Sequence, residues 1–238
     1  MSQKEERRTA VYIDGFNLYH GCLQGHEHYK WLDIEALCHN LISDRPIVSI
    51  KFFTARIKAK AARRPDADIR QDAYLKAIKQ RSNGRVEVIR GNFRRDQKKM
   101  HLCRPIPCKH HDNGGDHCHG DEKIAVWKNE EKQTDVSLSV HLINDAWLDL
   151  YDQAIIISND TDLEEAIKIA RVDHSPGKPP KHVGVITPTA WPGRKPAGTL
   201  VSAASWLKEV KESHLRDSQL PDTIPAGNSV LYRPLEWI

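Results

Sequence analysis

The sequence predicts an α/β fold built on a central, mostly parallel sheet of five strands. Short apolar runs typical of buried strands alternate along the chain with segments of helical periodicity. Strands interleaved with helices form parallel sheets with right-handed crossovers. Two of the apolar runs end in carboxylates: Val11–Ile13 leads into Asp14, and 155–157 is followed within a few residues by Asp160 and Asp162. Open α/β sheets bind ligands in this way, at the carboxyl ends of their strands.

The individual elements follow from local signals. Asp33 is a helix cap, and Gly84 follows the end of a second helix. Val136, Val140, Ile143 and Trp147 recur at helical spacing and predict one buried helical face. In order, we expect a strand at 10–14, a helix at 33–42, a strand at 47–53, a helix at 66–81, a strand at 86–89, a helix at 134–150, a strand at 154–158, a helix at 162–171 and a strand at 182–186.

Two segments depart from this alternation within what we expect to be a single domain over 1–238. Residues 94–128 are polar and rich in His and Cys, and they read as an inserted loop or minidomain. Residues 187–238 read as a C-terminal extension, with a helix at 205–215 and an extended tail from Leu220 onwards.

The composition, 39% hydrophobic and 29% charged, fits a soluble globular protein. No apolar run approaches the roughly 18 residues needed to span a membrane, and the first residues lack the apolar core of a signal peptide. We therefore expect a cytoplasmic protein without a membrane partner.

The net charge of +4 hides an uneven distribution along the chain. Between Arg56 and Lys99 there are 15 Lys and Arg against 5 Asp and Glu, whereas between Asp121 and Glu165 there are 3 Lys against 12 Asp and Glu. A basic half beside an acidic half suits a polyanion that is held by one face and cut at another. The alternative is a pair of solvated surfaces that attract each other.

Four aspartates are candidates for one metal site. Asp14, Asp160 and Asp162 lie at or just past expected strand ends, and Asp135 lies at a helix start. Converging carboxylates repel one another unless cations neutralise them, and oxygen ligands of this kind suit Mg²⁺ or Mn²⁺. Each motif also has a local explanation, as a turn, a capping box or a favourable helix-dipole charge. Their joint occurrence favours the metal site.

Three sequence blocks resemble the signature of NYN domains, LabA-like members of the PIN-like nuclease superfamily. The blocks are Tyr12-Ile13-Asp14-Gly15-Phe16-Asn17-Leu18-Tyr19, Glu131-Lys132-Gln133-Thr134-Asp135-Val136 and Ile157-Ser158-Asn159-Asp160-Thr161-Asp162-Leu163. The resemblance extends over about 10–186. It implies a PIN-like three-layer sandwich with strand order 3-2-1-4-5, in which the first and fourth strands are neighbours.

The resemblance also implies metal-dependent hydrolysis of RNA phosphodiesters, by an endonuclease that leaves a 5′-phosphate and a 3′-hydroxyl. By match to the motif, Asp14, Asp135, Asp160 and Asp162 would hold the metal. Asn17 would orient a phosphate or a water on the metal. Attack would be in line, by a water that the metal activates.

The inserted segment carries a second candidate metal site. Thiolates and imidazoles at this density are the ligands of tetrahedral Zn²⁺, and a metal could fold a loop that lacks its own core. The alternative is a surface loop with free thiols. The candidate zinc ligands are Cys103, Cys108, Cys118, His117 and His119.

Basic residues follow the second and third strands, at the edge where the carboxylates are expected. Such a pattern would track a nucleic-acid backbone, and a crevice favours single-stranded or looped RNA. The candidate RNA-binding residues are Arg56, Lys58, Arg63, Arg64, Arg94 and Arg95.

Two hypotheses remain from the sequence: a metal-dependent ribonuclease, and a non-catalytic RNA-binding or regulatory module of the NYN type. A haloacid-dehalogenase-like phosphatase is disfavoured because Phe16 stands where that class requires a second aspartate. The RNA target and the oligomeric state, including a homo-oligomer, are left open.

Overall fold

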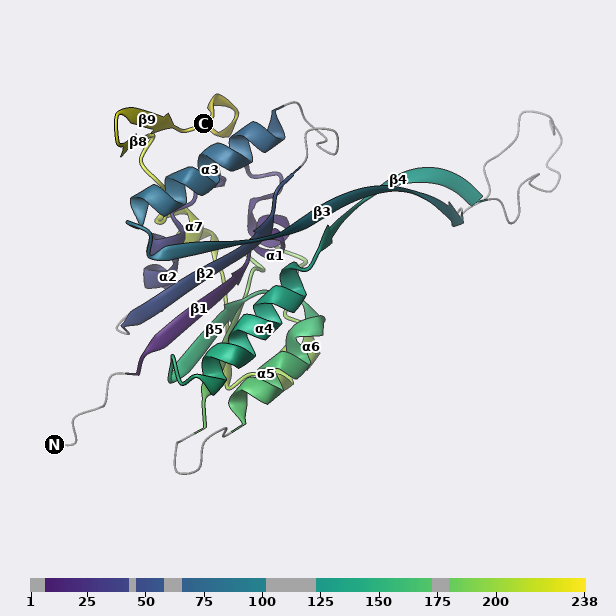
Figure 1. Ribbon diagram of the computed structural model, residues 1–238, viewed down its shortest axis with the longest axis vertical. Coiled ribbons are helices and arrows are strands. Elements are labelled where there is room, and N and C mark those ends of the chain that lie inside the picture. Colours follow the sequence, from purple (N-terminus) through teal and green to yellow (C-terminus); the bar gives the residue numbers. More distant parts are fainter. Residues whose placement is uncertain (1–6, 43–45, 58–65, 102–122, 173–179) are drawn as a thin grey trace.

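The computed structural model describes residues 7–42, 46–57, 66–101, 123–172 and 180–238. Its centre is a seven-stranded sheet of order β4-β3-β2-β1-β5-β6-β7 (Figure 1). Six strands run parallel, and β4 pairs antiparallel with β3 at one edge. The strands are β1 (Thr9–Asp14), β2 (Ile47–Ala55), β3 (Val86–His101), β4 (Lys123–Lys132), β5 (Gln153–Ile157), β6 (His182–Thr187) and β7 (Trp206–Glu209), with a separate hairpin of β8 (Thr223–Ala226) and β9 (Ser229–Tyr232).

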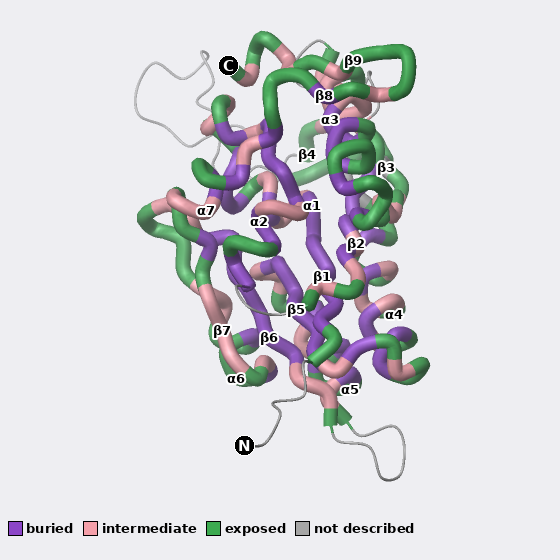
Figure 2. The backbone as a smooth tube through the Cα atoms, turned by 90° about the vertical axis from the view of Figure 1, so that its left-hand side faces the viewer, coloured by how far each residue is buried: buried purple, intermediate pink, exposed green. Residues whose placement is uncertain are grey.

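Helices cover both faces of the sheet and make three layers. One core lies between the sheet and α2, α3 and α7, and the other lies between the sheet and α4, α5 and α6. Figure 2 shows the inner strands as the most deeply buried part of the chain. The helices are α1 (Gly15–Leu18), α2 (Ile34–Leu41), α3 (Ala67–Arg81), α4 (Thr134–Trp147), α5 (Glu164–Arg171), α6 (Gly198–Ala203) and α7 (Glu212–Arg216), with single turns η1 (Tyr19–Leu23), η2 (Glu27–Tyr29), η4 (Thr161–Leu163) and η5 (Leu235–Trp237).

The expected strand order is confirmed, because the five expected strands correspond to β3-β2-β1-β5-β6. The expected number of parallel strands is wrong, since β7 adds a sixth beside β6. The sequence assigned this segment to a helix over 205–215, of which only α7 is helical. Packing decides the outcome: a Cβ on Gly184 of β6 would lie only 2.2 Å from the Trp206 ring. The Trp206 side chain therefore occupies the space that this glycine leaves.

The segment expected to be an inserted loop contains two long strands. β3 continues to His101 and β4 begins at Lys123, and together they form an antiparallel arm that projects from the body (Figure 1). The arm escaped prediction because neither of its faces is buried, so its strands lack the apolar alternation of a half-buried sheet. The candidate zinc ligands at 103, 108 and 117–119 lie outside the described residues.

Helix α4 buries a different face from the expected one. Of the four residues expected to be buried, Val136, Val140 and Trp147 are 67%, 58% and 63% exposed, whereas Ile143 is half-buried against the core. Both stripes of this helix have helical spacing, so periodicity alone could not decide which one faces the sheet. The buried apolar stripe is Leu138, Leu142 and Ala146.

A buried polar contact fastens α4 to the sheet. The carboxylate of Asp145 accepts hydrogen bonds from Tyr12 Oη at 2.6 Å and from Lys51 Nζ at 2.5 Å. Because an unpaired buried charge is costly, these partners fix how α4 lies across β1 and β2.

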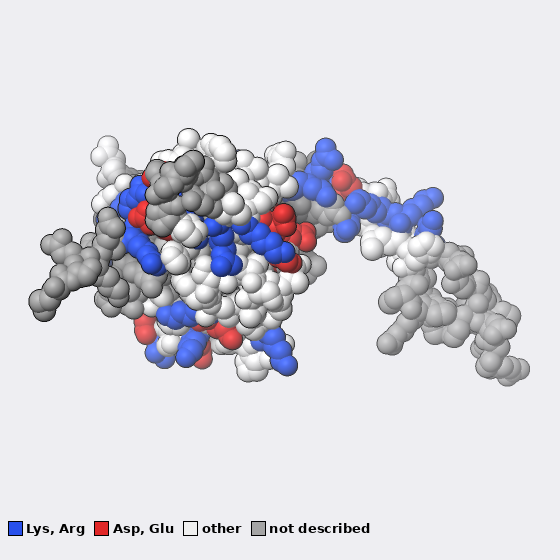
Figure 3. Space-filling model, turned by 90° about the horizontal axis from the view of Figure 1, so that it is seen from below, with Lys and Arg blue, Asp and Glu red and all other residues white. Residues whose placement is uncertain are grey.

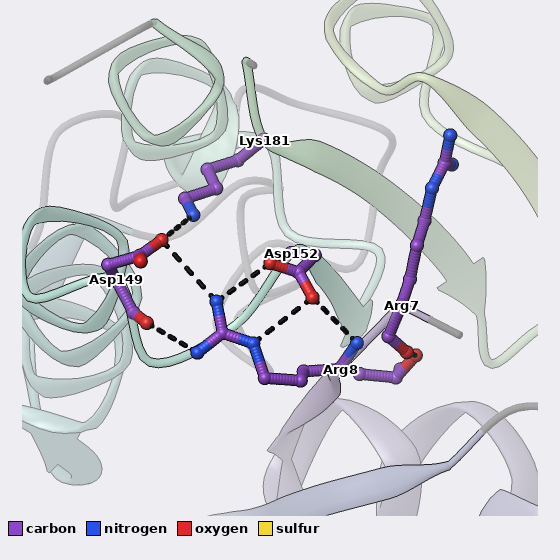
Figure 4. A network of polar contacts seen from close by, with 6 residues as sticks. Arg7, Arg8, Asp149, Asp152 and Lys181 are labelled. Carbon is purple, nitrogen blue, oxygen red and sulfur yellow. Dashed lines mark hydrogen bonds and ion pairs between the residues drawn. The ribbon is translucent and has the colours of Figure 1, made fainter. Parts of the chain in front are cut away.

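A second polar network holds the start of β1 beside β5 (Figure 4). The Arg8 guanidinium bonds Asp152 at 2.7 Å and the Asp149 carbonyl at 2.8 Å, and Lys181 also contacts Asp149. The chain segments before β1, β5 and β6 therefore meet at one end of the sheet. With their register fixed there, the carboxyl ends of β1 and β5 lie side by side at the other end.

Candidate metal centre

Three carboxylates from separate elements converge at the carboxyl end of the sheet. Asp14 ends β1, Asp160 follows the neighbouring strand β5, and Asp135 lies in the first turn of α4. Each offers one oxygen, and these three oxygens lie within 4.8 Å of one another. This spacing is short enough for one ion to contact all three.

Asp14 is the most deeply buried of the three, with 3% of the residue exposed. Its side chain caps α1 by accepting the Asn17 N–H at 2.8 Å, and it also accepts the Ser158 hydroxyl at 3.0 Å. Burial raises the pKa of Asp14 to about 6, and the charges of Asp135 and Asp160 add to the rise against these hydrogen bonds. Without a cation, ionisation of Asp14 is therefore disfavoured.

Asp135 is brought to the site by the junction of β4 and α4. Gln133, which precedes the helix, has a φ of 77°. Although much of the residue is exposed, Asp135 lines the same cavity as Asp14. Desolvation raises the pKa of Asp135, and the charges of Asp160 and Asp162 raise it further.

Asp162, the fourth expected ligand, lies outside this group of three. It is exposed in the turn η4, where its backbone N–H donates to Asp160 Oδ1 at 3.0 Å. Its charge still acts on Asp135 through the effect on the pKa of that residue. Asp162 thus contributes to the position of Asp160 and to the local potential.

Asn17 and Ser158 connect the ends of the two strands. Asn17 Oδ1 accepts the Asn159 N–H at 3.0 Å, and Ser158 Oγ accepts the Asp160 N–H at 3.1 Å. The sequence singled out Asn17 but missed Ser158. Its only signal was its position between the strand and Asp160, where a hydroxyl can hold both aspartates.

The carboxylates form part of the wall of an open cavity of about 430 Å³. Cations from the loop after β6 also line it, namely Arg194 and Lys195. Asn159 holds this loop against the site: its Nδ2 donates to the Lys195 carbonyl at 3.0 Å, and its Oδ1 accepts the Ala197 N–H at 2.8 Å. The sequence missed these cations as site residues, although they follow a strand that ends at the same edge.

The residues present fit a hard divalent cation. All donors within the group are carboxylate oxygens, the ligand type that Mg²⁺ and Mn²⁺ prefer. Burial of Asp14 and repulsion among the three carboxylates raise its pKa, and a cation would relieve both effects. The cavity thus presents negative charge for a metal beside positive charge for an anion.

The expected RNA-binding residues fall in different places. Arg56 lines a second cavity with Asp72 of α3, whose pKa is lowered mainly by Lys76 and also by Arg56. Arg94 and Arg95 lie on the arm. The remaining candidates, at 58, 63 and 64, lie outside the described residues.

Comparisons with known proteins identify a family, one relative with a named activity and one solved structure with the same fold. The model of the NYN domain family matches residues 8–176. The 6-hydroxy-3-succinoylpyridine 3-monooxygenase HspA of Pseudomonas putida (strain DSM 28022 / S16) is 33% identical over 250 residues, which cover 98% of this chain and 76% of that protein. A crystal structure of a protein of unknown function from Vibrio parahaemolyticus RIMD 2210633 shares the fold, with a TM-score of 0.50 and 18% identity over 92% of this chain and 100% of that one. Among the described residues, no helix has the length and apolar character of a membrane span.

Proposed function

The chain belongs to the NYN domain family, and from that premise we propose that it is a metal-dependent ribonuclease. The observation that carries the proposal is the convergence of Asp14, Asp135 and Asp160 within 4.8 Å, at the end of a parallel sheet. Three carboxylates held this closely repel one another, a bound cation would relieve that repulsion, and a cation held by carboxylates can serve phosphoryl chemistry. The substrate would be RNA, single-stranded or looped.

Asp14, Asp135 and Asp160 would hold Mg²⁺ or Mn²⁺ in this proposal. When bound, the ion would lower the pKa of the attacking water and offset the charge that builds on the phosphate in the transition state. Asp162 would keep Asp160 in position through its backbone N–H and add to the negative potential.

The chain's own polar groups would position the RNA. Arg194 and Lys195 line the cavity and would attract the phosphate. The side-chain carbonyl of Asn17 is engaged by Asn159, so its amide NH₂ group is the donor that a phosphate oxygen would meet. Asn159 would keep the cationic loop at its distance from the carboxylates.

A second candidate function comes from the relative in Pseudomonas putida. Its name describes a 3-monooxygenase of 6-hydroxy-3-succinoylpyridine, and the alignment covers 98% of this chain. The cavity of about 430 Å³ is of a size that holds small molecules, and Arg194 could bind a carboxylate as well as a phosphate. A monooxygenase of such an aromatic acid is therefore the competing proposal.

The deciding experiment is cleavage of end-labelled single-stranded RNA by the purified full-length protein. Mn²⁺ or Mg²⁺ would be supplied, with parallel samples in EDTA and with the Asp14→Asn and Asp160→Asn variants. We expect metal-dependent cleavage that EDTA and both substitutions abolish. Cleavage that survives both substitutions would contradict the assignment of the site.

The same preparation would be incubated with 6-hydroxy-3-succinoylpyridine, a reduced nicotinamide or flavin, and air. Oxygen-dependent loss of the pyridine without any RNA cleavage would reject the ribonuclease proposal in favour of the monooxygenase. Salt-sensitive RNA binding with neither activity would favour a non-catalytic RNA-binding module over both enzymes.

A further inference from the structure

The β3–β4 arm leaves the body of the protein next to the carboxylates. Its strands pair from Asn92 with Lys132 at the root to His101 with Lys123 at the outer end. At the root, Asn92 Nδ2 donates to Gln133 Oε1 at 2.6 Å, and Gln133 immediately precedes the helix that carries Asp135. The arm is therefore joined directly to an element of the candidate metal centre.

The outer arm has two unlike faces, because directly paired residues on neighbouring strands share a face. The first, here called the Trp127 face, holds three cations and no carboxylate among its described side chains. It comprises Arg95, Gln97, Lys99 and His101 of β3 with Trp127, Ala125 and Lys123 of β4.

The opposite face also carries cations, together with a carboxylate. There Asp96 is paired with Lys128, Lys98 with Val126 and Met100 with Ile124, and Arg94 lies nearer the root. All these positions lie on a ribbon whose described side chains are exposed or half-buried, and Figure 3 shows Lys and Arg gathered along it. The two faces therefore differ in kind more than in net charge, because the Trp127 face combines an exposed aromatic ring with cations and has no carboxylate among its described side chains.

Trp127 gains little from burial, since 60% of the residue is exposed. The Arg95 guanidinium lies 4.7 Å from the centre of its ring. Such a cation–π contact restrains the ring on a strand that has no core beneath it. The rest of the Trp127 surface stays open to a stacking partner.

The Trp127 face also belongs to the side of β3 that meets the candidate metal centre. Ile89 packs into the core beneath α4, and a Cβ on Gly91 would lie 2.6 Å from Thr134 Oγ1, next to Asp135. Side chains alternate along a strand, so Arg95 and Lys99 continue the side of Ile89 and Gly91. The Trp127 face is thus continuous with the side of β3 that meets the start of α4, and its first cation, Arg95, lies about 13 Å further out along the strand.

We propose that the Trp127 face is a docking surface for an RNA strand that extends from the metal centre. Trp127 stacks on an unpaired base, and Arg95, Lys99 and Lys123 contact phosphates. The inference rests on the proposed function in taking RNA as the substrate. A strand rise of about 3.3 Å per residue puts Arg95 and Lys99 roughly 13 Å apart, so the ligand is an extended polyanion and not a single nucleotide.

The test is binding of fluorescein-labelled single-stranded RNA to the full-length protein in EDTA, followed by anisotropy over a series of salt concentrations. Trp127→Ala should raise Kd by roughly tenfold with an unchanged salt dependence, because it removes a stack and no charge. Lys99→Gln with Lys123→Gln should flatten the slope of log K against log salt by about 1.4, since two phosphate contacts on a single strand are lost.

The matched control is Lys98→Gln with Lys128→Gln, which removes the same charge from the opposite face. We expect Kd to change less than threefold and the slope to stay the same. Equal weakening by both pairs, or unchanged affinity in Trp127→Ala, would overturn the assigned face. If no arm variant alters RNA affinity, the proposal is rejected, and an acidic protein surface becomes the candidate partner of the arm.

Binding in EDTA separates this inference from the ribonuclease proposal. If Trp127→Ala weakens binding of RNA that the wild type never cleaves, the docking surface stands and the nuclease fails. If the wild type cleaves RNA and no arm variant affects its affinity, the nuclease stands and the docking surface fails. Circular dichroism and thermal melting of each variant would verify that it is folded.

Discussion

The carboxyl end of the sheet and the β3–β4 arm both carry charged side chains, but the first holds them on buried strands and the second on an exposed ribbon. Every residue of β1 and β5 is buried, and these strands carry Asp14 and Asp160 at their ends. In the arm, every residue with a described side chain from Arg94 to His101 is exposed. A packed body can hold like charges against their repulsion, whereas an exposed ribbon can only present charge to a partner. The difference predicts that mutations in the body affect chemistry and stability, and that mutations in the arm affect binding.

The largest contrast should come from Asp14→Asn. We expect RNA cleavage to fall about 1,000-fold or more, since the loss of one group that acts on the transition state commonly costs 10²–10³ and a key group costs more. Single-turnover cleavage by wild type and variant, at saturating Mn²⁺, measures the effect.

The matched variant for that comparison is Trp127→Ala, which should leave single-turnover cleavage at saturating RNA close to wild type. Asp14→Asn should also retain RNA affinity in EDTA. A variant that loses cleavage and affinity together would instead indicate a folding defect.

Ile155→Ala in β5 should cost about 3 kcal/mol of unfolding free energy. Ile155 is 0% exposed and lies beside Val11 of β1. Truncation would remove buried methyl groups and leave a cavity that the close-packed sheet cannot close. Urea unfolding monitored by tryptophan fluorescence gives the difference. A loss below 1 kcal/mol would mean that the sheet is less rigid than its burial indicates.

The same contrast explains how much of the fold the sequence could predict. The runs before Asp14 and before Asp160 are apolar at consecutive positions, so strand character is visible locally, and their carboxylates follow at once. β7 was missed because the Trp206-Leu207-Lys208-Glu209 segment becomes a strand only by pairing with β6. The arm was missed because a ribbon exposed on both faces has no apolar pattern to detect.

The candidate site divides in the same way. Asp14, Asp135 and Asp160 could be selected from the sequence because each follows or begins a recognisable element, and their metal-binding role stays a prediction. Arg194 and Lys195 follow a strand that ends at the same edge, but the sequence does not show that their loop reaches the cavity through the hydrogen bonds of Asn159. Such contacts between distant segments leave no local pattern.

Asp14 should also make stability depend on pH in the absence of metal. Its pKa is about 6 in the folded protein against 3.8 for the ordinary group, so between these values the folded state keeps a proton that the unfolded state has lost. The stability that protonated Asp14 contributes is therefore present at low pH and is lost as pH rises towards about 6, by an amount on the order of 3 kcal/mol. Unfolding in EDTA between pH 4 and 7 should show this fall for wild type and a clearly smaller one for Asp14→Asn, in which the raised pKa of Asp135 remains.

Saturating Mg²⁺ should reverse that slope, because a cation replaces the proton that Asp14 carries. The stabilisation by Mg²⁺ should then increase as pH rises through about 6, and it should be absent in Asp14→Asn. Equal stabilisation of both proteins would place the ion elsewhere.

The smallest effect should come from Trp127→Ala on stability, less than about 0.5 kcal/mol. Replacing a buried tryptophan costs about 3–5 kcal/mol, but Trp127 is 60% exposed, and its identified ring contact is with Arg95 at a comparably exposed site. Urea unfolding, set beside the Kd for RNA, gives the decisive pair of numbers. Unchanged stability with a roughly tenfold weaker Kd would mean that the residue serves a partner, because the free protein gains little from holding a large aromatic ring in water. A loss of stability near that of Ile155→Ala would mean that the arm packs on the body, and the division between a rigid site and an exposed docking ribbon would have to be abandoned.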